Sequence, residues 1–336
     1  MLNVLNLKND ELKKYLIEND FKGFKANQII DWVYNKKVFD FEEMTNLSKD
    51  ERKSIANILN ISLPTIVKVQ ESKDGTIKFL LELYDGNLIE CVFMMYEYGN
   101  TICISTQVGC RMGCKFCAST VNGFLRNLEL SEIMSQILIV EKYTNKKINR
   151  IVVMGTGEPM HNYDNIVLFV REMKNKLGMS NRHITISTCG IVPKIYDLAQ
   201  EGININLAIS LHAVNDEKRK SLMPIANVYS ISQLVDACIY YFETTKRRVS
   251  FEYLLIDGLN DTDEDIAELI KLCKKVKAHV NIIPVNEIDE SDFKESKRLR
   301  KFCNSLLNYD VNATVRQKKG VDIDAACGQL RLSYSK

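Results

Sequence analysis

Apolar residues in the first part of the chain recur at the three- and four-residue spacing of a helix that is buried on one side. The positions that carry this pattern are Leu12, Leu16, Ile29, Ile30 and Val33. We therefore predict a small helical domain over residues 1–60. Between residues 61 and 95 the pattern changes to short β-rich runs, IVKVQ, TIKFLLEL and LIECVFMM, separated by glycine-containing turns. These runs predict a β-hairpin linker that leads into the main domain.

From residue 96 onward, short apolar runs alternate with longer amphipathic segments. The runs predict strands near residues 102–106, 150–154, 184–188, 205–211, 249–255, 279–283 and 312–316. The segments predict helices near residues 131–145, 163–177, 192–201, 231–246, 262–277 and 293–308. This alternation is typical of βα units around a parallel sheet. About six such units are fewer than the eight of a closed TIM barrel, so we predict an α/β fold with a partial, open (β/α)6 barrel over residues 96–336.

Composition and charge agree with an enzyme. The 336 residues, 46% of them hydrophobic, suffice for one large domain and a smaller one. The net charge of +2 means that any surface that binds nucleic acid must be local. No apolar run approaches membrane-spanning length, and the opening MLNVLNLKND lacks the features of a secretory signal. We therefore expect a cytoplasmic protein whose ten cysteines are reduced thiols.

The segment CRMGCKFC contains Cys110, Cys114 and Cys117 in the spacing C-x3-C-x2-C. Three thiolates can hold three irons of a [4Fe–4S] cluster and leave the fourth iron open to a small molecule. In a cluster that only transfers electrons, a fourth cysteine would normally close that position. The candidate for the open iron is S-adenosylmethionine (SAM), whose amino and carboxylate groups can chelate iron. The spacing resembles the motif of radical-SAM enzymes, and it predicts these three cysteines as cluster ligands.

A structural zinc site is the main alternative for the cysteine pattern. Zinc takes four protein ligands, usually from two separated Cys/His pairs. The sequence has no second pair, because Cys103 lies upstream and the four histidines are scattered at positions 161, 183, 212 and 279. A zinc site would therefore have to be assembled from distant residues.

Polar residues follow several of the predicted strands. The glycine turn GTGEP comes directly after the apolar run IVVM. Gly157 lets the backbone approach a ligand closely, and the Glu158 carboxylate can accept hydrogen bonds from the amino group of SAM. Further candidates are Ser187 in ITISTCG, Ser210, Leu211 and His212 in LAISLHA, and Asn286 in NIIPVN. Taken singly, each is typical of a helix cap or turn residue, but their repetition at one sheet edge favours a pocket for SAM.

Near the C-terminal end, the segment GVDIDAACGQL places Cys327 among small residues. An isolated cysteine is usually an inert small hydrophobe, which we expect for Cys238, Cys273 and Cys303 on their predicted helices. For Cys103 and Cys327 the residues alone leave a functional thiol and a packed thiol equally open, because thiolate reactivity depends on the surroundings.

Six ordered motifs, CISTQVGCRMGCKFC, MGTGEPMHN, ISTCGIVP, LAISLHA, EYLLIDGLND and VDIDAACGQL, together resemble the RlmN/Cfr family of dual-specificity RNA methyltransferases. The resemblance covers nearly the whole chain. It implies a [4Fe–4S] cluster, SAM as a second cofactor, and methylation of an adenine carbon in 23S ribosomal RNA, or in some members also in transfer RNA. It also implies an RNA-recognition role for residues 1–60 and an external electron donor such as flavodoxin or ferredoxin. We expect a monomer with no membrane partner.

The family scheme assigns roles to three further residues. The cysteine that matches Cys327 takes a methyl group from one SAM, and a radical derived from a second SAM removes hydrogen from that methyl group. The resulting carbon radical adds to the adenine ring and joins the enzyme to RNA. By motif position, Cys103 then attacks the sulfur of Cys327 and leaves a disulfide, while Glu90 takes the proton from the modified carbon. Without the resemblance, Glu90 would be placed on the solvent face of its strand.

The site of methylation and the reaction class have alternatives. The Glu158-Pro159 pair resembles the RlmN pattern and favours C2 of adenine over C8, which Cfr enzymes methylate to confer antibiotic resistance. A non-catalytic iron–sulfur or zinc RNA-binding protein, and a radical-SAM enzyme with a small-molecule substrate, are the other hypotheses. Basic residues near the motifs are Lys115, Arg126 and the run Arg316-Gln317-Lys318-Lys319. They fit phosphate contacts, although such a run is by itself typical of a solvated surface.

Overall fold

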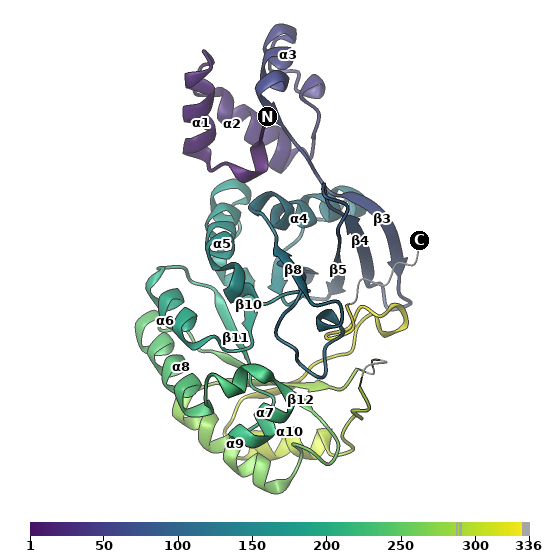
Figure 1. The fold of residues 1–336 in the computed structure, drawn as a ribbon, viewed down its shortest axis with the longest axis vertical. Helices are drawn as coiled ribbons and strands as arrows, with labels where there is room; N and C mark the ends of the chain where they lie inside the picture. The colour runs from purple at the N-terminus through teal and green to yellow at the C-terminus, as the bar shows by residue number, and fades with distance from the viewer. Residues whose placement is uncertain (287, 289–290, 331–336) are drawn as a thin grey trace.

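The structure is a computed structural model that describes residues 1–286, 288 and 291–330. Its main element is a ten-stranded sheet with the strand order β14-β13-β12-β11-β10-β9-β6-β5-β4-β3. Helices lie along the outer side of this sheet, and a small helical unit stands at one end of the molecule (Figure 1). A search of the described residues finds no helix with the length and apolar character needed to cross a membrane.

The partial α/β barrel predicted from the sequence is confirmed. Within the described residues, seven neighbouring strands are parallel: β6 Gly99–Cys103, β9 Arg150–Val153, β10 Ile184–Thr188, β11 Asn206–Ser210, β12 Ser250–Leu255, β13 His279–Pro284 and β14 Ala313–Val315. The helices between them are α4 Leu130–Thr144, α5 Tyr163–Leu177, α6 Val192–Gln200, α7 Asp216–Leu222, α8 Ile231–Thr245, α9 Asp263–Val276 and α10 Leu299–Asn308. Because the strands are parallel, their carboxyl ends meet at one edge of the sheet.

Three antiparallel strands extend the same sheet on its other side. They are β3 Thr65–Glu71, β4 Ile77–Glu82 and β5 Leu88–Tyr96, and β5 pairs with β6 so that Val92 lies opposite Cys103. Successive residues of a strand point to opposite faces. Phe93 is therefore buried in the main core, whereas Val92 packs with Cys103 and with Ile323 and Ala325 of the C-terminal segment. Glu90 shares the face of Val92, so the strand places it beneath that segment.

The N-terminal unit contains α1 Asn9–Glu18, α2 Lys25–Ile30, a π-helical turn Asp31–Asn35 and α3 Lys49–Ile58, with the two-residue strands β1 Leu2–Asn3 and β2 Leu59–Asn60. All five apolar positions that carried the helical pattern are buried. The remaining short elements are β7 Gln107–Gly109, β8 Phe124–Asn127, and the 3-10 turns Val4–Asn6, Phe41–Glu43, Ala118–Thr120, Pro159–Asn162, Asn181–His183, Pro224–Asn227 and Val321–Ile323.

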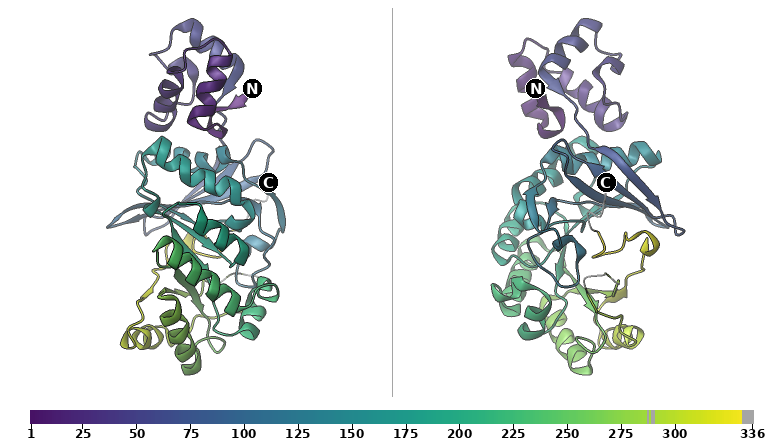
Figure 2. Two further views of the ribbon diagram at one scale, coloured as in Figure 1. Left: turned by 90° about the vertical axis from the view of Figure 1, so that its left-hand side faces the viewer. Right: turned by 45° about the vertical axis from the view of Figure 1, so that its right-hand side comes forward.

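The N-terminal unit stands at one end of the barrel (Figure 2). Buried polar contacts attach it there. The Lys176 ammonium of α5 donates to the carbonyl of Leu7 at 2.6 Å and lies 3.3 Å from the Tyr34 hydroxyl. Its ion-pair partner is Glu172, also at 3.3 Å. The Asn6 side chain accepts a hydrogen bond from the first turn of α4, where backbone N–H groups lack helical partners. A buried lysine is tolerated only with such partners. Because a shift of the N-terminal unit would take these partners from Lys176, the contacts favour one orientation of the unit.

The predicted helix over residues 293–308 begins later, at Leu299. The preceding residues are committed to other contacts: Glu295 forms a bridge with Ile256, and the Ser296 hydroxyl donates to the buried Asp261 at 2.5 Å. These contacts tie the segment to the loop after β12 and leave it unavailable for helix formation.

Candidate active site

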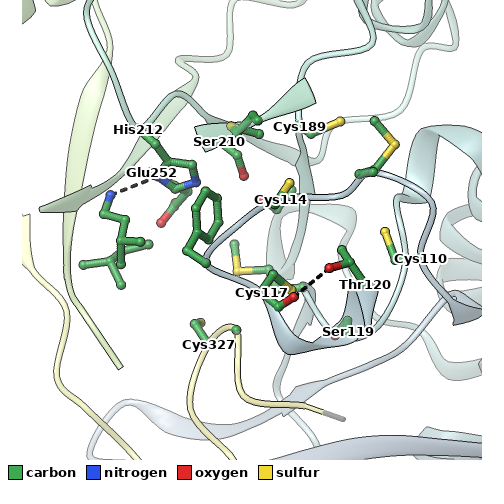
Figure 3. A pocket seen from close by; sticks show the side chains of 18 of the residues that line it. Cys110, Cys114, Cys117, Ser119, Thr120, Cys189, Ser210, His212, Glu252 and Cys327 are labelled. Carbon is green, nitrogen blue, oxygen red and sulfur yellow. Dashed lines mark hydrogen bonds between the residues drawn. The ribbon is translucent and has the colours of Figure 1, made fainter. Parts of the chain in front are cut away.

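The loop between β7 and β8 turns three thiols toward one cavity. Its backbone is fixed by hydrogen bonds from the Cys110 N–H to Gly123 O at 2.8 Å and from the Cys117 N–H to Cys114 O at 3.2 Å. Cys110, Cys114 and Cys117 all line the same cavity (Figure 3). The spacing that predicted a shared role thus corresponds to a shared location.

The carboxyl ends of the parallel strands form the opposite wall of this cavity. The predicted residues that line it are Gly157, Glu158, Ser187, Ser210, His212 and Asn286. Leu211 differs from them, because its side chain is fully buried in the core and does not line the cavity. Leu211 does lie at the strand end, as predicted, but the alternation of side chains turns it away from its neighbours Ser210 and His212.

Backbone N–H groups hold the Glu158 carboxylate in place. One of its oxygens accepts from Met160 at 3.0 Å and the other from Cys189 at 2.7 Å. Gly157 has a φ of +112°, and a Cβ on it would lie 2.7 Å from the side chain of Gln107. Glycine therefore lets the turn pack against Gln107, and the turn delivers a fixed, buried carboxylate to the cavity wall.

His212 presents a neutral imidazole to the cavity. Burial, and then the Arg219 charge, lower the pKa of His212 to about 3. Its Nδ1 accepts the Leu254 backbone N–H at 2.9 Å, so we assign the ring proton to Nε2. The ring packs edge-on against Phe116 of the cysteine loop, with centroids 4.6 Å apart. This arrangement provides a hydrogen-bond donor for a ligand.

The C-terminal loop brings Cys327 to the same cavity. Asn286 donates to the carbonyl of Cys327 at 3.0 Å, and the Ala118 N–H donates to the carbonyl of Gly328 at 2.8 Å. Gly328 has a φ of +84°, and a Cβ there would lie 2.8 Å from the carbonyl oxygen of Phe116. Small residues around Cys327 therefore allow its loop to dock closely on the cysteine loop.

Cys327 also lines a second cavity, which extends through the barrel to the amino-terminal edge of the sheet. Cys103, at the end of β6, lines this cavity as well. Burial, and then the nearby Cys327 thiol, raise the pKa of Cys103 to about 12. All ten cysteines are free thiols in the structure. The two candidate thiols are thus neighbours, although they lie 224 positions apart in the sequence (327 minus 103).

Glu90 is buried and does not line either of these two cavities. Its carboxylate forms an ion pair with Lys78 of β4 at 3.3 Å. The same ammonium donates to the carbonyl of Asp324 in the C-terminal loop at 3.2 Å. Lys78 therefore links the Glu90 carboxylate to the loop that carries Cys327. Because Glu90 is buried, its placement on the solvent face of the strand is wrong.

Two family models match the chain. The model of the Radical SAM superfamily matches residues 104–273, and the model described as Ribosomal RNA large subunit methyltransferase N-terminal domain matches residues 2–61. Over its full length the chain is 53% identical to a Clostridium perfringens (strain 13 / Type A) protein named "Probable dual-specificity RNA methyltransferase RlmN", of which the match covers 98%. This chain belongs to the RlmN family. The family uses a [4Fe–4S] cluster and SAM, as the cysteine spacing predicted.

Other members and a solved structure agree with the RlmN assignment. A Clostridium novyi (strain NT) protein with the same name is 49% identical, and the match covers 99% of each chain. The crystal structure of a radical SAM methyltransferase from Sphaerobacter thermophilus superposes with a TM-score of 0.95 at 39% identity. That match covers 98% of this chain and 99% of the other, so the two share the whole fold.

The three thiols fit the cluster that the RlmN family uses. Each cluster thiolate binds a different iron, so the sulfurs must surround a space rather than converge on one point. Cys110, Cys114 and Cys117 all line one side of the same cavity, which leaves space beside the three sulfurs. Within residues 1–286, 288 and 291–330, no three His, Cys, Asp or Glu side chains are arranged to hold a metal ion.

Burial raises the pKa of Cys110 to about 11 and the pKa of Cys114 well above its usual range. Iron coordination requires the thiolate forms and stabilises them, which offsets the cost of burying negative charge.

Sequence reasoning missed Arg219, a fully buried residue of α7. Its guanidinium donates to the carbonyl of Cys189 at 2.7 Å, and to the carbonyls of Ser210 and Leu211, both at 3.2 Å. These carbonyls lie where β10 and β11 end, so Arg219 clamps two strand ends that form the cavity wall. The surrounding sequence DEKRK resembles a solvated helix and carries no signal of this role.

Replacing Arg219 by methionine should weaken SAM binding about 10-fold or more, because each buried carbonyl left unpaired costs about 1–3 kcal/mol. Equilibrium dialysis of the reconstituted protein with SAM measures this. Arg247→Met is the matched control, since Arg247 bonds the carbonyl of Ile205 at the opposite end of β11. It should lower thermal stability without changing SAM affinity. Equal losses of affinity in both variants would contradict a specific role for Arg219.

Arg316 also has a place that the sequence did not indicate. The guanidinium forms an ion pair with the buried Glu252 at 3.3 Å and lies 3.9 Å from the sulfur of Cys327. The basic run was expected to contact phosphate or to form a solvated surface. At Arg316 the structure instead places a cation beside the candidate methyl carrier.

Proposed function

We propose that this chain methylates C2 of an adenosine in 23S ribosomal RNA through an S-methylated Cys327. The supporting observation is that Cys327 stands where two cavities meet, one lined by the cysteine loop and the strand ends, the other by Cys103 and basic residues. A methyl carrier needs access to its methyl donor on one side and to the acceptor base on the other. The dual-specificity name of the relatives extends the proposal to the adenosine beside the anticodon of transfer RNA.

Residues that line the first cavity bind the cofactors. Cys110, Cys114 and Cys117 hold the cluster. Glu158 and His212 contact SAM. Glu158 accepts a hydrogen bond from the amino group of SAM, and the His212 Nε2–H donates one to an acceptor atom of SAM. The other residues proposed to contact SAM are Gly157, Ser187, Ser210 and Asn286. When bound, the cluster and SAM supply the methyl group and a 5′-deoxyadenosyl radical.

Cys327 is the nucleophile that receives the methyl group. Its thiolate sulfur attacks the methyl carbon of SAM and forms an S–C bond, while the bond between that carbon and the sulfonium sulfur breaks and S-adenosylhomocysteine leaves as a neutral thioether. The Arg316 guanidinium stabilises the negative charge on the attacking sulfur. Hydrogen removal from this methyl group then allows its carbon to bond to the adenine ring.

Cys103 and Glu90 release the product. The ring radical left by this addition gives up one electron to a one-electron acceptor, which the oxidised cluster would supply, and Glu90 accepts the proton from the methylated ring carbon. The Cys103 thiolate attacks the sulfur of Cys327, an S–S bond forms, and the bond between that sulfur and the RNA-linked carbon breaks. The electron pair of the broken bond stays with carbon, which takes a proton and becomes the methyl group. An external reductant later returns the disulfide to two thiols.

Partners follow from this chemistry. The N-terminal helical unit recognises RNA shape, which its fixed attachment to the barrel suits. An external one-electron donor such as flavodoxin or ferredoxin reduces the cluster. The enzyme acts as a monomer in the cytoplasm, where its thiols stay reduced.

The test is anaerobic incubation of reconstituted protein with SAM, a reductant and unmodified ribosomal RNA, followed by nucleoside digestion and mass analysis. We expect 2-methyladenosine. 8-Methyladenosine would move the chain to the Cfr reaction type. Neither product, from protein that still cleaves SAM, would overturn the RNA substrate. Absence of 5′-deoxyadenosine as well would favour the non-catalytic RNA-binding hypothesis.

A further inference from the structure

Tyr96, the last residue of β5, and Tyr98, in the turn that leads to β6, form a stacked pair on the wall of the second cavity. The rings of Tyr96 and Tyr98 have centroids 4.8 Å apart and an interplanar angle of 8°. Tyr98 is 62% exposed. The Arg150 guanidinium lies 5.0 Å from the centroid of the Tyr98 ring, and the Lys319 ammonium lies 5.6 Å from that of Tyr96. The pair therefore presents a planar aromatic surface with a cation at each ring.

The charged side chains that line the second cavity are all basic. Among the described residues, the charged groups that line it are Arg150, Arg316, Lys318 and Lys319, with no Asp or Glu. Arg316 and Lys318 are engaged in ion pairs with carboxylates that lie outside the lining. Within the described part of the chain, Arg150 and Lys319 form no ion pair, so their charge is available to a ligand.

The cavity connects this aromatic surface to the proposed chemistry. Cys103 and Cys327 line the same cavity as the two tyrosines, and Arg316 lies beside the sulfur of Cys327. A ligand that extends along the cavity can therefore contact the tyrosines with one part and place another part at the sulfur of Cys327.

We propose that Tyr96, Tyr98, Arg150 and Lys319 form a binding surface for a single-stranded RNA segment next to the target adenosine. One base stacks on Tyr98, and Arg150 and Lys319 contact the flanking phosphates. Aromatic rings combined with cations suit RNA, because unstacked bases bind to rings while the backbone binds to positive charge. The inference rests on the proposed function and adds to it the residues that hold the substrate strand.

Tyr98→Ala should raise the Kd for an unmodified fluorescent RNA hairpin about 10-fold, and should lower kcat/KM for that RNA by a similar factor, as expected for loss of one stacked base. Tyr98→Phe keeps the ring and should stay within about twofold of the wild-type protein. Tyr309→Ala is the matched control, because Tyr309 is 59% exposed at the end of α10 and does not line the cavity. It should leave both quantities unchanged.

Salt dependence tests the two cations. Arg150→Ala and Lys319→Ala should each reduce the slope of log affinity against log salt concentration by about one. Lys275, which pairs with Asp236 on the outer helices, supplies the control variant Lys275→Ala. An unchanged slope in the Arg150 and Lys319 variants would overturn their assignment as phosphate contacts.

Measurements without RNA separate this inference from the proposed function. SAM cleavage and methylation of Cys327 are followed in the same preparations, and Tyr98→Ala should match the wild-type protein in both. A loss of either would show that Tyr98 supports the fold, and an unchanged Kd for RNA would show that the tyrosines do not bind it. Failure of the wild-type protein to bind RNA would contradict the proposed function itself.

Discussion

Cys327→Ala should abolish methyl transfer to RNA while the protein retains its cluster and its ability to cleave SAM. The side chain of Cys327 lies between the two cavities, and alanine offers no sulfur to receive the methyl group. The loop that carries it is held mainly by hydrogen bonds that its backbone carbonyls accept. These carbonyls take no part in the reaction, and the alanine variant retains them. We therefore expect the loop to stay docked and the loss of activity to be complete.

Nucleoside mass analysis after incubation with unmodified ribosomal RNA measures the loss, and iron content with the visible absorbance spectrum measures the cluster. Cys303→Ala is the control, since Cys303 is a buried thiol of α10 that lines neither cavity. It should methylate RNA at the wild-type rate. Methylated adenosine from the Cys327 variant at even a tenth of the wild-type rate would rule out a methyl carrier at this position.

The parts of the site that the sequence predicted depend on short-range patterns. Cys110, Cys114 and Cys117 lie within eight residues, so their spacing alone indicates a shared ligand. Ser187 and Ser210 lie at the carboxyl ends of the neighbouring parallel strands β10 and β11, and such ends meet at one edge whatever the details of packing. The partial barrel was predictable for the same reason, because each βα unit has its own periodicity.

The parts that the sequence did not indicate depend on contacts between distant segments. Arg219 is bonded to backbone carbonyls, which any residue supplies, so no side-chain pattern marks its role. Tyr96 meets Lys319 only because the C-terminal segment returns to the face of β5. Leu211 was predicted to line the pocket but does not, since proximity to a strand end does not determine which way a side chain points.

Glu90→Gln should trap the covalent link between Cys327 and RNA. Glutamine has nearly the shape of glutamate but is a far weaker base, so the RNA adduct should form and its ring carbon should keep the proton that Glu90 would accept. A denaturing gel should show a protein band whose mobility changes on treatment with ribonuclease. The band should be absent in the double variant with Cys327→Ala, because that protein has no sulfur to form the link.

The ion pair between Glu90 and Lys78 makes a second variant necessary. Removing one partner of a buried pair destabilises a protein by about 3–5 kcal/mol, so Glu90→Gln should lower the melting temperature, and the assay must run well below it. Lys78→Met breaks the same ion pair but keeps the carboxylate. If proton transfer is the role of Glu90, Lys78→Met should be destabilised yet release methylated RNA without a persistent adduct. An adduct in both variants would mean that Glu90 positions the Cys327 loop through Lys78, and normal turnover by Glu90→Gln would remove it from the mechanism.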